Sequence, residues 1–230
     1  MKRIFLIIIA LGFIFSMNAQ KVGAKIGLNL SGVNTDVDLQ SYETSELLAG
    51  LNGGFVFDFT PKKVGIRIEA LYSQKGYKVT ADTKLIDGTT DVKTDFSLNL
   101  DYIEIPILLK LKFGPAYLTA GPYFAYAVQG NEIVTMTTDV GELAESQVED
   151  EGQIPYNDIF KDGEFNGDDI TFDRTDFGLN VGLGAEFMMF FAEARYGVGL
   201  TDINDYNDVD SDNFTKNYTI TFSAGMMFGR

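Results

Sequence analysis

Residues 103–113 read IEIPILLKLKF, so an apolar side chain stands at every second position from Ile103 to Phe113. Successive side chains of a β-strand point to opposite faces, and a period of two therefore predicts a strand with one apolar face. The same alternation recurs in seven other segments: 22–30, 51–59, 64–72, 118–128, 177–187, 192–200 and 218–228. The sequence therefore predicts an all-β protein with eight strands.

The links between these segments alternate between short and long. The short links are Thr60–Lys63, the turn around Gly114 and Pro115, and the turn around Met188 and Met189. The long links are 31–46, 76–95, 130–176 and 201–216. Such alternation gathers all long links at one end of an up-and-down sheet, as in outer-membrane barrels. We therefore expect an eight-stranded antiparallel up-and-down transmembrane β-barrel with long outer loops.

Two features interrupt the regular pattern. Pro106 and Pro122 lie inside predicted strands that a closed barrel would pair on both sides, and proline cannot donate to the ladder. We expect a β-bulge at each of these prolines. The apolar residues from Phe96 to Tyr102 also alternate on the opposite phase to those that follow, which predicts a bulge near Asp101.

The positions between the apolar ones carry ten charges that sum to zero. They are Lys25, Arg67, Lys110, Lys112 and Arg195 against Asp58, Glu69, Glu104, Glu186 and Glu193. Charges that face water need no such balance in an acidic chain, whereas ions sealed inside a narrow barrel each need a partner. We therefore expect the apolar face to meet lipid. The predicted structural ion network in the lumen comprises Lys25, Asp58, Arg67, Glu69, Glu104, Lys110, Glu186, Glu193 and Arg195.

Residues 1–19 are expected to be a cleaved signal peptide, and residues 20–230 the barrel domain. Lys2 and Arg3 precede an apolar run from Ile4 to Phe15, and Ala19 is a small residue of the kind that signal peptidase requires. The apolar run is shorter than the ~20 residues that a spanning helix needs. Cleavage would remove two positive charges from a chain whose net charge is −15.

Most of the negative charge lies in two long links. Residues 130–176 hold 14 Asp or Glu against two basic residues, and residues 201–216 hold five Asp against one Lys. A solvated acidic rim is one interpretation, and a surface that binds divalent cations is another.

The stretch 162–173 resembles a calcium loop, with Gly at position 6 and a carboxylate at position 12. Its candidate ligands are Asp162, Glu164, Asn166, Asp168 and Asp173. The stretch departs from the motif because Ile170 falls one position late and position 12 is Asp rather than Glu.

The composition excludes several classes of chemistry. The chain has no Cys and no His, which excludes disulfides, imidazole-bound zinc and Ser-His-Asp triads. The acidic net charge argues against a nucleic-acid partner, whose phosphates need Lys and Arg. A hydrolase would have to use paired carboxylates such as Glu104 and Glu193, but the inward acids are matched by equal numbers of basic residues. A passive channel is disfavoured because bulky inward side chains such as Arg67, Tyr117 and Tyr123 would fill an eight-stranded barrel.

Four stretches of the chain form a recognisable set: LDYIEIPILLK at 100–110, GPYF at 121–124, DFGLNVGLGAEF at 176–187 and RYGVGLTDI at 195–203. Together they resemble the small outer-membrane β-barrels of Bacteroidota that are often called PorT-like. The resemblance spans the chain after residue 20 and implies a barrel in the outer membrane. It does not imply the secretion role from which the family takes its name.

These observations predict a non-enzymatic integral outer-membrane protein with a closed lumen, which acts as a scaffold or interacts through its acidic outer loops. The expected partners are membrane lipid and an envelope protein, the chain is expected to be a monomer, and calcium is the sole candidate cofactor. One alternative is a soluble periplasmic lipocalin-like protein whose apolar face lines a cavity for a small apolar ligand. A second and weaker alternative is an outer-membrane hydrolase that uses paired carboxylates.

Overall fold

The computed structural model describes residues 21–35, 43–84, 91–139, 145–148, 171–172, 174–201, 204–205 and 215–229. The predicted signal peptide and all five candidate calcium ligands lie outside these residues. The strands are β1 (Lys21–Thr35), β2 (Glu43–Phe59), β3 (Val64–Lys84), β4 (Asp91–Phe113), β5 (Ala116–Asp139), β6 (Glu145–Val148), β7 (Thr171–Phe172), β8 (Thr175–Phe187), β9 (Phe190–Gly199), β10 (Asn204–Asp205) and β11 (Thr215–Gly229).

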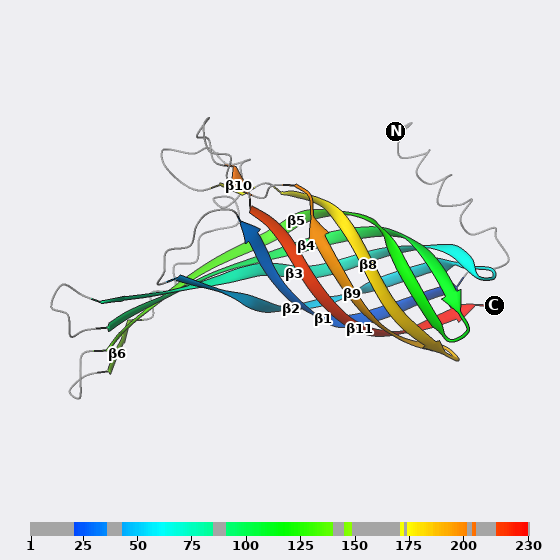
Figure 1. Cartoon of the computed structure of the whole chain (residues 1–230), viewed down its shortest axis with the longest axis horizontal. Coiled ribbons are helices and arrows are strands. Elements are labelled where there is room, and N and C mark those ends of the chain that lie inside the picture. Colours follow the sequence, from blue (N-terminus) through cyan, green and yellow to red (C-terminus); the bar gives the residue numbers. More distant parts are fainter. Residues whose placement is uncertain are drawn as a thin grey trace.

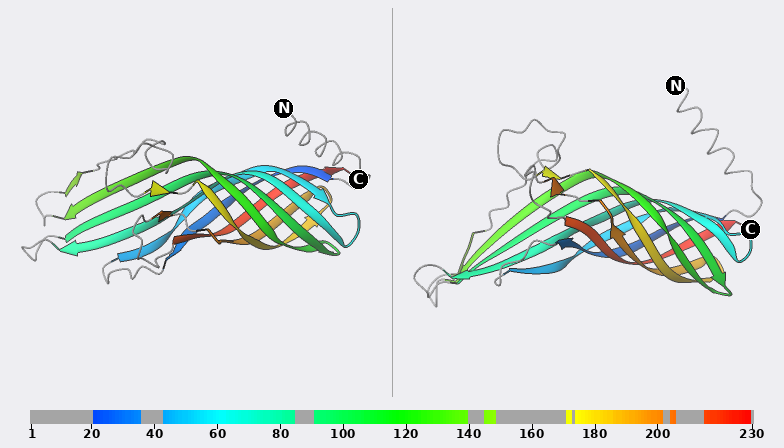
Figure 2. Two further views of the ribbon diagram at one scale, coloured as in Figure 1. Left: turned by 90° about the horizontal axis from the view of Figure 1, so that it is seen from above. Right: turned by 45° about the horizontal axis from the view of Figure 1, so that its top comes forward.

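Eight of the described strands close into an antiparallel ring (Figures 1 and 2). Their order around the ring is β1, β2, β3, β4, β5, β8, β9 and β11, and β11 pairs back onto β1 along its whole length. The short strand β6 pairs with the far end of β5, and β7 pairs with β10. The predicted eight-stranded up-and-down barrel is therefore confirmed.

The strands at the long-link end extend further than the alternation predicted. Strand β3 continues to Lys84, β4 begins at Asp91 and β5 continues to Asp139, so most of the expected link 76–95 and residues 130–139 of the expected link 130–176 are strand. These three strands project beyond β1, β8, β9 and β11 (Figure 2). The sequence pattern misses the extensions because few apolar residues mark one face there: KVTADTK at 78–84 has only Val79 and Ala81.

The bulges expected at the two prolines are absent from the described ladders. Pro106 pairs with Tyr123, and the register between β4 and β5 is the same before and after both prolines. Proline removes one donor, and the ladder tolerates this loss without an extra residue. The pairs that would join Ile107 to Pro122 and Leu108 to Gly121 are instead left out of the ladder.

The bulge predicted near Asp101 is confirmed, although the reason for it differs. Asp101 pairs with Gln129 and Tyr102 with Ala127, so Val128 is the extra residue and belongs to β5. Strand β4 does not change phase: Leu98, Leu100 and Tyr102 are buried in step with Glu104. The apolar residues of β4 thus move from the outer face to the inner face where the barrel extends past its apolar belt.

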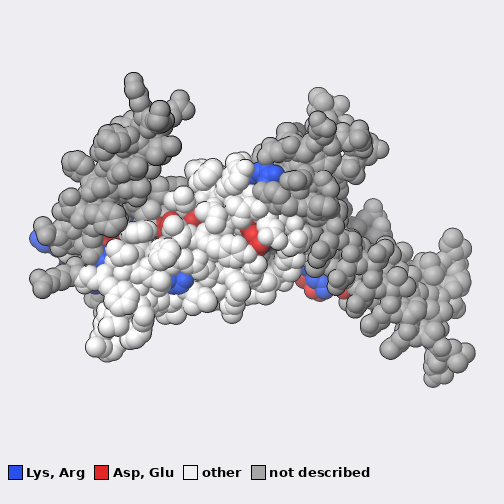
Figure 3. Space-filling view, turned by 180° about the vertical axis from the view of Figure 1, so that it is seen from behind, with Lys and Arg blue, Asp and Glu red and all other residues white. Residues whose placement is uncertain are grey.

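The outer wall is apolar and the interior is charged. Phe55 is 63% exposed and Val181 55% exposed, whereas Arg67 is completely buried. Figure 3 shows the described wall largely free of Lys, Arg, Asp and Glu. The lipocalin-like alternative is therefore wrong, because it requires the apolar stripe to converge on the barrel axis.

The described part of the chain has no helix with the length and apolarity needed to cross a bilayer.

Candidate functional site: the ion-paired lumen

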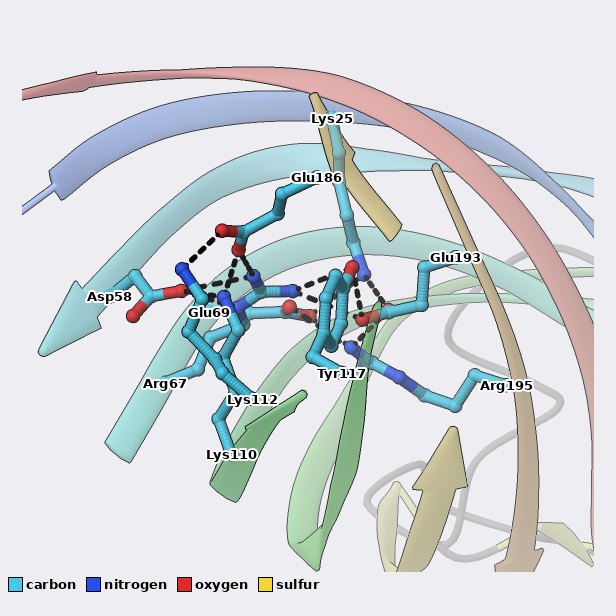
Figure 4. Close-up of polar contacts among 10 residues, drawn as sticks. All are labelled: Lys25, Asp58, Arg67, Glu69, Lys110, Lys112, Tyr117, Glu186, Glu193 and Arg195. Atoms are coloured by element: carbon cyan, nitrogen blue, oxygen red, sulfur yellow. Dashed lines mark hydrogen bonds and ion pairs between the residues drawn. The ribbon is translucent and has the colours of Figure 1, made fainter. Parts of the chain in front are cut away.

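The predicted lumen charges come from six strands and converge on the barrel interior (Figure 4). Strand β1 supplies Lys25, β2 supplies Asp58, β3 supplies Arg67 and Glu69, β4 supplies Lys110 and Lys112, β8 supplies Glu186, and β9 supplies Glu193 and Arg195. Each of these residues occupies an inward position of the strand alternation. Of the predicted set, Glu104 lies in a separate cluster.

Arg195 and Glu69 form a bidentate ion pair at the centre of the lumen. The two terminal nitrogens of Arg195 donate to the two oxygens of Glu69 at 2.9 and 3.0 Å. Arg195 also donates to Glu193 at 2.5 Å, and the Lys25 ammonium lies 2.8 Å from Glu69. Paired planar groups of this kind form the strongest charge-assisted hydrogen bonds, so this contact holds β9 to β3 across the barrel.

Arg67 links several strands in the same cluster. Its guanidinium donates to Asp58 at 3.0 Å, to Glu193 at 3.0 Å and to Glu186 at 3.3 Å. It also stacks on the Tyr117 ring, with 4.8 Å between the guanidinium carbon and the ring centroid. One fully buried cation therefore contacts side chains of β2, β5, β8 and β9.

The lysines of β4 neutralise the remaining acids near the short-turn end. Lys110 pairs with Asp58 and with Glu186, and Lys112 lies 2.7 Å from the second oxygen of Glu186. The Lys110 ammonium also lies 4.4 Å from the centroid of the Tyr117 ring. Glu186 is thus surrounded by basic groups although it stands close to the β8–β9 turn.

A second, smaller cluster lies toward the long-link end. Lys75 pairs with Glu104 at 2.8 Å and with Asp176 at 3.3 Å, and Asp176 accepts from Tyr123 and Asn217. Sequence reasoning missed Lys75 and Asp176 because each lies just beyond a predicted strand. Continuing the period of two from Arg67 and Glu69, or back from Gly178, places both residues on the inner face. With them, six basic and six acidic side chains face one another inside the described barrel.

Side chains fill the lumen between the two clusters. The internal cavity there has a volume of about 10 Å³ and is lined by Lys25 and Arg195 on one side and Lys75 and Glu104 on the other. A space of this size holds about one water molecule. Farther out, Leu98, Leu100, Tyr102, Tyr123, Ala125 and Ala127 form an apolar core.

Among the described lumen residues, every charged side chain of the two clusters has a partner of opposite charge. Each of the six carboxylates contacts at least one basic side chain. Glu104 and Glu193 have different basic partners. Glu104 pairs with Lys75, and Glu193 pairs with Lys25, Arg67 and Arg195. Within the described residues, no group of acidic side chains is placed to hold a metal ion.

A glycine makes room for the Tyr117 ring, and this contact gives a first prediction. A Cβ added at Gly184 would lie 2.3 Å from the ring carbon that bears the Tyr117 hydroxyl and 2.7 Å from the backbone oxygen of Ala192. Gly184→Ala is therefore expected to destabilise the barrel by about 1–3 kcal/mol through overpacking. Urea unfolding in lipid bicelles measures the effect. The matched change Ala185→Val, on the outward face of the same strand, should have little effect, and equal stabilities of the two variants would contradict the proposed packing.

A closed antiparallel ring with an apolar outer wall and a charge-paired lumen defines a transmembrane barrel of the outer-membrane class. The chain belongs to the outer membrane protein beta-barrel domain family, whose model matches residues 16–205. A search of the curated proteins found no match.

Among solved structures, the barrel is similar to three small outer-membrane proteins. Ail, the attachment invasion locus protein of Yersinia pestis, is 12% identical with a TM-score of 0.40, and the match covers 91% of this chain and 99% of Ail. Neisserial surface protein A is 9% identical with a TM-score of 0.37, and the match covers 91% of this chain and 97% of that protein. OprG from Pseudomonas aeruginosa is 15% identical with a TM-score of 0.34, and the match covers 93% of this chain and 98% of OprG.

Proposed function

We propose that this outer-membrane protein is a non-enzymatic barrel with a closed lumen, which acts as a scaffold or presents its acidic outer loops to a partner. The observation that carries this proposal is the filled lumen. Its six described carboxylates are all ion-paired, and the cavity between the clusters has room for about one water molecule. The small size of this cavity supports a closed lumen, and the ion pairing of the carboxylates supports a structural rather than a catalytic role for them.

The orientation follows from the lengths of the links. Short turns at the periplasmic end and long links outside are the rule for outer-membrane barrels. We propose that residues 1–19 are cleaved during export, that the barrel is a monomer surrounded by lipid, and that an envelope protein is the partner of the outer loops. The calcium motif at 162–173 stays a prediction.

A closed lumen predicts that the purified protein conducts no steady current in planar lipid bilayers. The physical reason is that Arg67, Arg195 and Tyr117 occupy the space that a hydrated ion would need. A heat-modifiability gel on the same sample checks that the barrel is folded, since a folded barrel migrates differently before and after boiling. A large and stable conductance from folded protein would contradict the proposal.

The interaction role is tested by capturing partners from intact membranes. The tagged full-length chain would be cross-linked, purified and compared with a variant in which Glu142, Glu145, Glu149, Asp150 and Glu151 are changed to the corresponding amides. If the acidic rim recruits a partner, the variant should fold normally and lose the cross-linked protein. Capture of the same protein by the unchanged chain and by the variant would show that loop acidity is not what recruits it.

A further inference from the structure

The short-turn end of the barrel is chemically uneven. The β2–β3 turn carries Pro61, Lys62 and Lys63, all exposed. The β8–β9 turn consists instead of Met188 and Met189 between Phe187 and Phe190, and all four side chains are exposed, with Phe187 at 74% and Met188 at 81%. Turns in water are usually built from Gly, Pro, Asn, Asp and Ser. Four large apolar side chains at an exposed turn therefore indicate a surface that something apolar covers.

The backbone of this turn also favours a different residue. Met188 has a φ of 57°, in the left-handed region that costs least for glycine. The β4–β5 turn meets the same requirement with Gly114, whose φ is 67°. At Met188 an apolar side chain thus stands in a conformation that glycine would adopt with less strain, and burial of its surface in an apolar environment would offset that strain.

The apolar belt of the barrel wall runs without interruption into this turn. The three outward cross-strand pairs of the β8–β9 hairpin nearest the turn are Leu183 with Ala194, Ala185 with Ala192 and Phe187 with Phe190. Phe190 also pairs with Met226 on β11. The Met189 carbonyl accepts a hydrogen bond from the Met227 amide at 2.7 Å. The turn is therefore held against the neighbouring strand, and no charged side chain separates it from the belt along these pairs.

A shallow apolar groove lies on the same wall, next to the turn. Its volume is about 750 Å³, and Ala116, Ala185, Ala192 and Ala224 stand side by side in it across β5, β8, β9 and β11. Strands β8, β9 and β11 lie on the near side of the barrel in Figure 1. The groove continues the lipid-facing surface toward the periplasmic end, where Phe187 and Phe190 follow the pair Ala185 and Ala192.

We propose that the β8–β9 turn is immersed in the hydrocarbon of the periplasmic leaflet, where phospholipid acyl chains cover Phe187, Met188 and Phe190. The β2–β3 turn, with Lys62 and Lys63, ends at the headgroups and water. Lipid is the occupant because the turn is continuous with the wall that lipid already covers in an outer-membrane barrel. The inference rests on the proposal that the barrel spans the membrane, and it does not depend on the closed lumen. A conductance result that contradicts the closed lumen would therefore leave this inference standing, and the reverse also holds.

Site-directed labelling tests this placement cleanly, because the chain has no cysteine of its own. Met188→Cys, Lys62→Cys and the mid-wall control Val181→Cys would each carry a nitroxide in nanodiscs of phosphatidylethanolamine and phosphatidylglycerol. Accessibility to oxygen, which concentrates in hydrocarbon, is compared with accessibility to a water-soluble nickel complex. The oxygen-to-nickel ratio at position 188 is expected to approach that at position 181 and to exceed clearly that at position 62.

Two other outcomes would overturn the proposal. A label at position 188 that meets the nickel complex as readily as the label at 62 places the turn in water. A label at 188 that is shielded from both reagents shows that protein covers the turn, and a dependence on the protein-to-lipid ratio identifies a second copy. If Met188→Cys does not fold, Met189→Cys samples the same turn. As a further check, Met188→Asp should lower the folded fraction more than Lys62→Asp does. An equal decrease in the folded fraction of the two variants would contradict the placement of the β8–β9 turn in hydrocarbon.

Discussion

Replacing Arg67 by methionine is expected to lower the free energy of unfolding by about 3–5 kcal/mol, the cost of breaking a buried ion pair by removing one partner. Methionine keeps most of the side-chain volume but removes the charge that contacts Asp58, Glu186 and Glu193. The described lumen would then hold one uncompensated negative charge without water to solvate it. Urea unfolding in bicelles measures the change in the free energy of unfolding, and gel mobility without boiling reports the folded fraction at each urea concentration.

A second substitution separates loss of charge balance from loss of packing. Adding Glu193→Gln to Arg67→Met restores equal numbers of positive and negative charges inside the described barrel. If neutrality governs stability, the double variant should be more stable than Arg67→Met alone. A double variant as unstable as the sum of the two single changes would mean that particular contacts matter and charge balance does not.

Val181→Arg is expected to destabilise the folded barrel by about 2–4 kcal/mol, because it places a cation on the lipid face near the middle of the membrane. Val181 is the central residue of β8 and its side chain points outward, with 55% of its surface exposed. The same denaturation experiment measures this effect. In detergent, where the headgroups and water lie closer to the wall, the loss should be smaller.

A matched control lies on the same outer face near the membrane boundary. Val22 is the second residue of β1 and also points outward. Val22→Arg should cost only about 0–1 kcal/mol, because the cation can reach the interface there. Equal losses at positions 22 and 181 would mean that depth in the membrane does not set the penalty, and would contradict the lipid-facing assignment of the wall.

The local pattern was sufficient to predict strand number and side-chain direction. Glu69 and Arg195 stand inside, and Phe55 and Val181 outside, as the alternation predicted. The pattern failed where its polarity changed along one strand. On β4 the alternation of apolar residues shifts by one position at Tyr102, which suggests a change of phase, but the backbone continues in phase and the interior itself becomes apolar.

The limits of the strands were also beyond the local pattern. Lys75 and Asp176 lie just outside the predicted strands, because the apolar residues that mark those strands end at Tyr72 in the first case and begin at Phe177 in the second. Only the pairing of β3 with β4 and of β5 with β8 shows that both residues still belong to the barrel wall. Their ion pair across the lumen, at 3.3 Å, identifies them as members of the network.

The sequence by itself determined which side chains face inward and that their charges cancel, because the direction of a side chain follows from backbone geometry within a few residues. Only the tertiary structure decided which charge meets which. Arg67 contacts Glu193 from a position 126 residues earlier in the chain, and Arg195 contacts Glu69 across the same separation. Such contacts depend on the stagger of all eight strands when β1 closes against β11, and that stagger is a property of the whole ring.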